Sequence, residues 1–230
     1  AMDVDGVITG DPAELLWQER EKWRQLWRGE EEKTRVQDDD DAWEEKDALR
    51  ELTEEDVLKA AKTFGHRTSS TYDGLHPRHF ASLSDEALDT IGCFLEAVEW
   101  SGKWPPGVNR VAVALIPKPK GGTRPIGLFS GLHRLWTRVR RPVADEWEHH
   151  HNRRFLAARR GNGAVDTVWK QALAAERCTG DGKITASILI DMRSFFEFIK
   201  HEDLEARGWA TNFNPVIMRL ALDSYRLARV

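Results

Sequence analysis

The chain has few of the residues and segments that define several classes of protein. Its 230 residues include two cysteines, Cys93 and Cys178, and no CxxC or CxxxC pair. This scarcity argues against a disulfide framework and against a cysteine-rich zinc site. No apolar run is long enough to span a bilayer, and the first ten residues lack the basic flank and apolar segment of a signal peptide. The sequence therefore predicts an intracellular protein of the nucleus or cytoplasm that has no membrane span.

Acidic and basic side chains are unevenly distributed along the sequence. Residues 1–55 hold 19 Asp and Glu against 8 Lys and Arg, whereas the other 175 residues hold 19 against 26. Within residues 100–177 the count is 15 basic against 5 acidic. A basic body behind an acidic leader favours a polyanionic partner, although ordinary surface charge would give the same pattern.

Tryptophan is abundant, with ten residues against two tyrosines. Trp17, Trp23 and Trp27 lie at helical spacing within residues 13–35, which predicts an amphipathic helix. The acidic run Asp38–Asp41 follows as a solvated linker, so we expect a separate leader over residues 1–51. The tryptophan stripe either packs on its own domain or forms an interface for a partner.

The remainder of the chain combines several helical patterns with few strand patterns. Apolar spacing and caps predict helices over 54–63, 85–100, 132–148, 166–177 and from 204 onward, the last stretch (215–230) running to residue 230. Cys93 falls on the apolar side of one of these helices and is expected in the core. Short apolar runs predict strands over 111–116, 126–129 and 184–190. These elements define an α+β fold with too few strands for a doubly wound sheet.

A Gly-rich turn joins the first two predicted strands and carries several cations. Lys118 and Lys120 precede Gly121 and Gly122, and Arg124 follows them. A hairpin end of this kind can reach a ligand, with Arg and Lys offering hydrogen bonds and charge to phosphate oxygens. A solvated β-turn is an equally good interpretation of these residues by themselves.

The third predicted strand ends at a carboxylate. Residues 188–190 are apolar, and Asp191 and Met192 follow them. A rigid strand that delivers an Asp at its end can present a ligand to Mg²⁺, which prefers hard oxygen atoms. An Asp that caps the following turn is the alternative interpretation. The predicted helix over 132–148 adds a basic side that comprises Arg134, Arg138, Arg140 and Arg141.

Taken in order, four segments resemble reverse transcriptases, in particular those of non-LTR retrotransposons and group II introns. The segments are Tyr72-Asp73-Gly74, IPKPKGGTRPIGL (116–128), the Arg159-Arg160-Gly161 loop and LIDMRSFFEFIKHEDL (189–204). The resemblance spans residues 52–204. It implies helix-rich polymerase fingers with a β-hairpin over 52–183, and then the first strand and helix of a palm over 184–230, truncated before the rest of that palm.

The resemblance also implies roles for individual residues. Asp191 matches the first catalytic aspartate, which binds Mg²⁺, and Met192 would add its main-chain carbonyl. Lys118 and Arg124 match residues that hold the triphosphate of the incoming dNTP, and Phe196 matches the residue beneath its sugar. The residues expected to contact the template or primer backbone are Lys120, Arg159, Arg160 and Arg138. The implied parent protein is an RNA-directed DNA polymerase acting on an RNA template and a DNA primer with Mg²⁺.

The chain departs from the family pattern in the acidic residues of the catalytic site. The pair of adjacent aspartates that the family carries on a later hairpin is missing, since the only Asp-Asp run is residues 38–41 in the leader. We therefore expect the chain to be inactive by itself and to need a downstream palm and thumb of the same polypeptide. The uncovered strand edge should also make it self-associate. Two alternatives remain, a catalytically dead, domesticated RNA-binding remnant of a retroelement and a helical interaction module centred on the tryptophan stripe.

Overall fold

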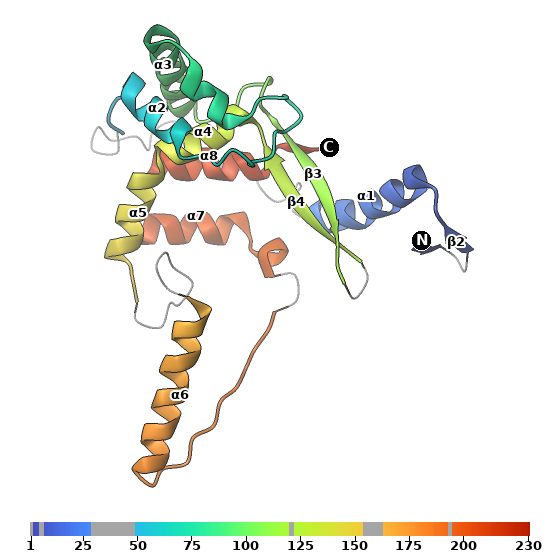
Figure 1. The fold of residues 1–230 in the computed structure, drawn as a ribbon, viewed down its shortest axis with the longest axis vertical. Coiled ribbons are helices and arrows are strands. Elements are labelled where there is room, and N and C mark those ends of the chain that lie inside the picture. The colour runs from blue at the N-terminus through green and yellow to red at the C-terminus, as the bar shows by residue number, and fades with distance from the viewer. Residues whose placement is uncertain (1, 5–6, 29–48, 120–121, 154–162, 193–194) are drawn as a thin grey trace. The chain divides into compact units, whose positions relative to one another are not determined.

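The computed structural model describes residues 2–4, 7–28, 49–119, 122–153, 163–192 and 195–230. The chain divides into two units (Figure 1). Unit 1 comprises residues 1–145 and 199–230, and unit 2 comprises residues 146–198. Each unit is described by itself below.

The described residues form a helix-rich α+β structure, which agrees with the predicted fold class at this coarse level. The α-helices are α1 (Pro12–Arg28), α2 (Glu54–Lys62), α3 (Asp85–Ser101), α4 (Gly131–Val139), α5 (Arg141–His150), α6 (Ala164–Gly180), α7 (His201–Ala210) and α8 (Pro215–Tyr225). Two 3₁₀ helices are η2 (Pro77–Ser82) and η3 (Phe195–Phe198). The strands are β1 (Met2–Val4), β2 (Val7–Thr9), β3 (Arg110–Pro117), β4 (Thr123–Phe129) and β5 (Ala228–Arg229).

The main sheet of unit 1 has the strand order β4-β3-β5. Strands β3 and β4 form a long antiparallel hairpin in register from Val111 opposite Phe129 to Pro117 opposite Thr123 (Figure 1). Strand β5 pairs in parallel with the start of β3, where Arg110 lies opposite Ala228. The first two strands form a separate two-stranded antiparallel ladder. The hairpin thus projects from a base to which the end of the chain returns.

Two clusters of buried side chains form the core of unit 1. One joins α3, α8 and the base of β3 and includes Leu95, Trp104 and Leu220. The other joins α2, α3, η2 and α4 and includes Val57, Leu88 and Leu135. Burial of a leucine or valine side chain contributes about 1.5–3 kcal/mol, so these clusters hold the helices around the base of the hairpin.

Local capping signals set the starts of two helices in unit 1, as the sequence predicted. Thr53 caps α2, and the carboxylate of Asp56 accepts a hydrogen bond from the Thr53 N–H in a reciprocal capping box. Hydrogen bonds from Arg50 help to lower the pKa of Asp56. Ser84 caps α3, which ends at Gly102 in a left-handed conformation.

The predicted helix over 132–148 is broken into α4 and α5. Pro142 causes the break because proline has no N–H to donate and its ring clashes with the carbonyl of the preceding turn. Arg140 lies at the break and turns inward, where 4% of its side chain is exposed. The prediction that Arg140 belongs to the basic side of this helix was therefore wrong. Its guanidinium donates to both carboxylate oxygens of Glu99, at 2.6 and 2.7 Å.

Three other predictions about local structure were wrong. Residues 184–190 are extended but form no strand, because a strand requires a hydrogen-bonded neighbour and no described residue pairs with them. The final helix ends at Tyr225 instead of residue 230, since Val230 exchanges backbone hydrogen bonds with β3 at 2.8 and 2.9 Å. Cys93 is exposed and does not lie in the core.

Within the described ranges, no helix has both the length and the apolar character that crossing a membrane requires.

Candidate nucleic-acid interface

The β3–β4 hairpin presents two of the predicted site residues together. The N–H of Lys118 donates to the carbonyl of Gly122 at 2.9 Å, which closes the end of the hairpin. Gly122 has φ of +78°, a left-handed conformation that glycine adopts without steric cost. Arg124 lies directly opposite Ile116 in the register. Arg124 is therefore part of β4, and Lys118 directly follows β3 and is held there by a backbone hydrogen bond.

Lys118 and Arg124 lie on the same face of this hairpin. Residues directly opposite in an antiparallel pair share a face, and so do residues two apart along one strand. Ile116 pairs with Arg124 and precedes Lys118 by two positions, so the three side chains share one face. Both cations are exposed, and Ile116 is 50% exposed. This face can contact a polyanion with two positive charges around an apolar centre.

The opposite face of the hairpin is covered by α1. Its buried Glu19 accepts hydrogen bonds from the Thr123 hydroxyl of β4, from Trp23 Nε1 at 3.0 Å and from the Lys22 ammonium at 3.2 Å. Burial would raise the pKa of Glu19, but these hydrogen bonds outweigh burial and the pKa lies below its ordinary value. An ionised Glu19 therefore ties α1 to the hairpin.

A second basic surface lies on α4. The guanidinium groups of Arg134 and Arg138 lie over the Phe64 ring, 5.7 and 5.1 Å from its centroid. Arg134 also donates to the carbonyl of Ser69 at 2.7 Å. Burial and the nearby charge of Arg138 lower the pKa of Arg134, against the opposing charge of Asp73. The two arginines are thus held in place by cation–π contact, as a phosphate-binding surface requires.

The Tyr72-Asp73-Gly74 segment positions this helix. Asp73 accepts hydrogen bonds from the Gly131 N–H at 2.6 Å and from the Thr71 hydroxyl at 2.6 Å. Gly131 begins α4, and a Cβ there would lie 3.3 Å from Leu75 Cβ. The contribution of Asp73 is therefore to fix the loop against the start of the basic helix.

The predicted metal ligands lie in unit 2. Asp191 and Met192 follow the extended residues 184–190 and are exposed, with Met192 59% exposed. Among the described residues, no group of three or more His, Cys, Asp or Glu side chains is placed to hold a metal ion. One carboxylate does not fit a two-metal site, so these residues alone support no step through Mg²⁺.

Several predicted site residues lie outside the described ranges. These are Lys120, which falls between β3 and β4 in the sequence, and Arg159 and Arg160, which precede α6 in the sequence. Phe196 lies in η3, and only its backbone is described. Lys118 and Arg124 thus lie together on the hairpin of unit 1, and Arg138 lies on α4 of the same unit. Asp191 belongs to unit 2.

Sequence reasoning did not identify one set of basic residues. Arg20, Arg24, Arg226 and Arg229 line a pocket between α1 and the edge of the sheet. The alternation of tryptophan and arginine over residues 17–28 could have indicated Arg20 and Arg24 as binding residues. No neighbouring residue indicates Arg226 or Arg229 in the same way, because β5 forms only through its pairing with β3.

No protein-family model matches this chain. No curated protein sequence matches it either. The argument for function therefore rests on the residues and geometry described above.

Proposed function

We propose that this chain is the fingers and the opening of the palm of a reverse transcriptase. Its parent would be an RNA-directed DNA polymerase that uses Mg²⁺ and dNTPs on an RNA template with a DNA primer. In that protein, Lys118 and Arg124 bind the triphosphate of the incoming nucleotide, and Arg138 contacts the nucleic-acid backbone. Asp191 supplies one carboxylate to the site that the downstream palm completes.

One observation carries this proposal. Lys118 and Arg124 share an exposed hairpin face in a chain whose later segment ends an apolar run at Asp191. Phosphoryl transfer asks a protein chiefly for positioning and for positive charge on the phosphates. A rigid hairpin with two cations around an apolar centre meets that requirement, and the order of the segments matches that of the family.

The experiment is primer extension on an RNA template by the polypeptide that continues through the downstream palm. For Lys118→Ala/Arg124→Ala we expect the KM for dTTP to rise by at least about tenfold, because two charge-assisted hydrogen bonds to phosphate are lost. The affinity for template–primer should change little. Asp191→Ala should abolish extension, since no other described residue replaces its carboxylate.

The matched control is Lys59→Ala/Lys170→Ala, which removes the same charge from exposed positions on α2 and α6. Its KM for dTTP should stay within about twofold of the parent value, as is usual when exposed surface charges are removed. An equal rise in KM in both double variants would refute the role of the hairpin. Full activity in Asp191→Ala would refute the catalytic assignment.

A second candidate function is RNA binding without catalysis by a remnant of a retroelement. The exposed cations of the hairpin and the half-buried arginines of α4 support it equally, because neither surface needs a catalytic centre to bind RNA. The two functions predict different results in the primer-extension assay with dTTP. A remnant would bind RNA in a salt-dependent manner and would show neither extension nor an effect of Asp191→Ala.

A further inference from the structure

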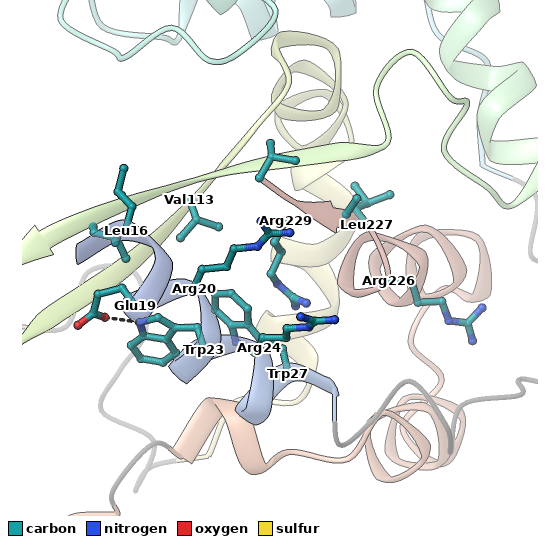
Figure 2. Close-up of a pocket in the computed structure, with 13 residues that line it drawn as sticks. Leu16, Glu19, Arg20, Trp23, Arg24, Trp27, Val113, Arg226, Leu227 and Arg229 are labelled. Atoms are coloured by element: carbon teal, nitrogen blue, oxygen red, sulfur yellow. Dashed lines mark hydrogen bonds between the residues drawn. The ribbon is translucent and has the colours of Figure 1, made fainter. Parts of the chain in front are cut away.

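A pocket of 490 Å³ lies between α1 and the edge of the sheet formed by β3 and β5 (Figure 2). Val113 and Leu115 of β3 line it, so it opens on the sheet face opposite Lys118 and Arg124. Its volume is within the range of sites that hold a small ligand or one unit of a polymer. The proposed function assigns this pocket no role.

Aromatic rings from α1 form one side of the pocket. Trp23 and Trp27 stack with their centroids 5.5 Å apart, and the guanidinium of Arg229 lies 4.6 Å from the centroid of Trp27. Figure 2 shows Arg229 approaching these rings from the sheet side. Stacking on the ring holds the guanidinium flat, and its Nη2 also donates to the carbonyl of Tyr225 at 3.3 Å. These contacts fix the position of one cation at the wall of the pocket.

Positive charge dominates the lining. Four arginine side chains line the pocket, Arg20, Arg24, Arg226 and Arg229, and among the described lining residues Glu19 has the one acidic side chain. Glu19 already accepts hydrogen bonds from Trp23, Lys22 and Thr123, so its charge is directed at these donors. The apolar side chains of Leu16, Val113 and Leu115 lower the local dielectric and strengthen attraction to an anion.

We propose that this pocket binds one nucleotide unit of single-stranded RNA, with its phosphate on the arginines and its base or ribose against the apolar wall. The inference rests on the proposed function for the identity of the polymer. Basic grooves with interleaved aromatic side chains are typical of single-strand binding, and the volume is too small for a duplex. Because Arg226 and Arg229 come from the end of the chain, the pocket exists only when β5 is paired with β3.

The first test measures how tightly the 230-residue chain binds a fluorescein-labelled oligouridylate, by fluorescence anisotropy at several salt concentrations. The oligonucleotide has about 12 nucleotides, within the site size of such a groove. The variant is Arg20→Ala/Arg226→Ala, since neither side chain makes a hydrogen bond or ion pair with another described residue. We expect about a tenfold loss of affinity and a salt slope reduced by about one. Lys59→Ala/Lys170→Ala, the charge-matched control, should lose less than about twofold.

The second test locates the RNA directly. Leu16 lines the pocket and is 61% exposed, so a photoreactive benzoylphenylalanine can replace it without loss of core packing. We expect it to cross-link to the oligouridylate more strongly than the same group at Leu83, which is 41% exposed and does not line the pocket. Equal cross-linking at the two positions overturns the proposal, as does an Arg20→Ala/Arg226→Ala variant that matches its control.

A competition arm separates RNA from other polyanions. A polyglutamate peptide that displaces the oligouridylate at equal concentration of charge would show a general anion site and overturn the assignment to RNA. Weak displacement by the peptide supports it. Failure of the pocket is distinguishable from failure of the proposed function, because the latter is read from the KM for dTTP and from Asp191→Ala.

Discussion

Unit 1 and unit 2 contain amphipathic elements of the same kind, but the two units differ in burial. Leu88 and Leu95 on α3 are 1% and 0% exposed in unit 1. In unit 2, Trp169 and Leu173 lie one turn apart on the same face of α6 and are 63% and 58% exposed, and none of the described residues of this unit is buried. Both helices have 17 residues. Local sequence thus determines the helix, whereas burial depends on a partner surface.

The extended residues 184–190 make the same point for strands. Ile184, Ile188 and Ile190 are 100%, 86% and 82% exposed. An apolar run of this kind pairs only when a neighbouring strand supplies its hydrogen bonds. The expectation that the chain self-associates stays a prediction, and these side chains identify the surface through which it would do so.

The largest difference in unfolding free energy between matched variants of the two units is expected for a buried ion pair. Glu99→Ala should lower the free energy of unfolding by about 3–5 kcal/mol, because it leaves the buried Arg140 without its counter-charge. It also removes the acceptor of Trp136 Nε1, at 2.7 Å. Urea unfolding followed by circular dichroism measures the change.

Asp181→Ala is the matched change in unit 2. Asp181 pairs with Lys183 at 3.8 Å, and their side chains are 56% and 70% exposed. We expect a change within about 0.5 kcal/mol, as is usual for exposed pairs. Similar losses in the two variants would mean that the Glu99–Arg140 pair is not buried in solution.

A second comparison uses leucine truncation. Leu220→Ala should destabilise the protein by about 2–5 kcal/mol, because Leu220 is 0% exposed and its loss leaves a cavity. Leu173→Ala should change stability by no more than about 0.5 kcal/mol, since its side chain already contacts water. A large loss in the Leu173 variant, measured by the same unfolding assay, would show that α6 is covered in solution and would remove the contrast between the units.

The smallest expected effect is a dependence of the unfolding free energy on pH, which arises from His133 in unit 1. His133 is stacked on Phe129 and bonded to the Ser224 hydroxyl at 2.8 Å, and burial lowers its pKa from 6.5 to about 4. The unfolded chain therefore binds the proton at higher pH than the folded protein does. The stability from neutral His133 is complete above about pH 6.5 and falls as the pH drops towards 4.

Between pH 7 and pH 4.5 this linkage should cost about 2–3 kcal/mol of unfolding free energy. The variant His133→Gln cannot be protonated, so its loss over the same interval should be smaller by that amount. Unfolding curves at the two pH values provide the comparison. Parallel losses in the wild-type chain and in His133→Gln would exclude His133 as the origin of the acid sensitivity.

The sequence predicted those features of the fold that depend on neighbouring residues. The capping box of Thr53 and Asp56 and the turn before Gly122 need only a few residues each, and the structure contains both. The hairpin that presents Lys118 and Arg124 follows from the same local signals. The roles of these two residues in binding phosphate stay predictions.

The remaining features arise from contacts between residues far apart in the chain. Arg140 looks like a surface cation in a helical pattern, and only the distant Glu99 makes its burial possible. Residues 228–229 form a strand because β3 offers a free edge, so the arginines beside it could not be assigned to a pocket from the sequence. The pocket therefore became visible only in the folded structure.

The closure of one core cluster by α8 also has a consequence for how the protein is made. Trp104 donates to the Ser224 hydroxyl at 3.0 Å, so one core cluster is closed by residues separated by 120 positions. During synthesis at about 5–20 residues per second, α3 and the hairpin leave the ribosome several seconds before α8 does. Throughout that interval their apolar surfaces lack α8. The nascent chain is therefore a substrate for chaperones until translation reaches α8, and a pause in translation before that helix would prolong the exposure.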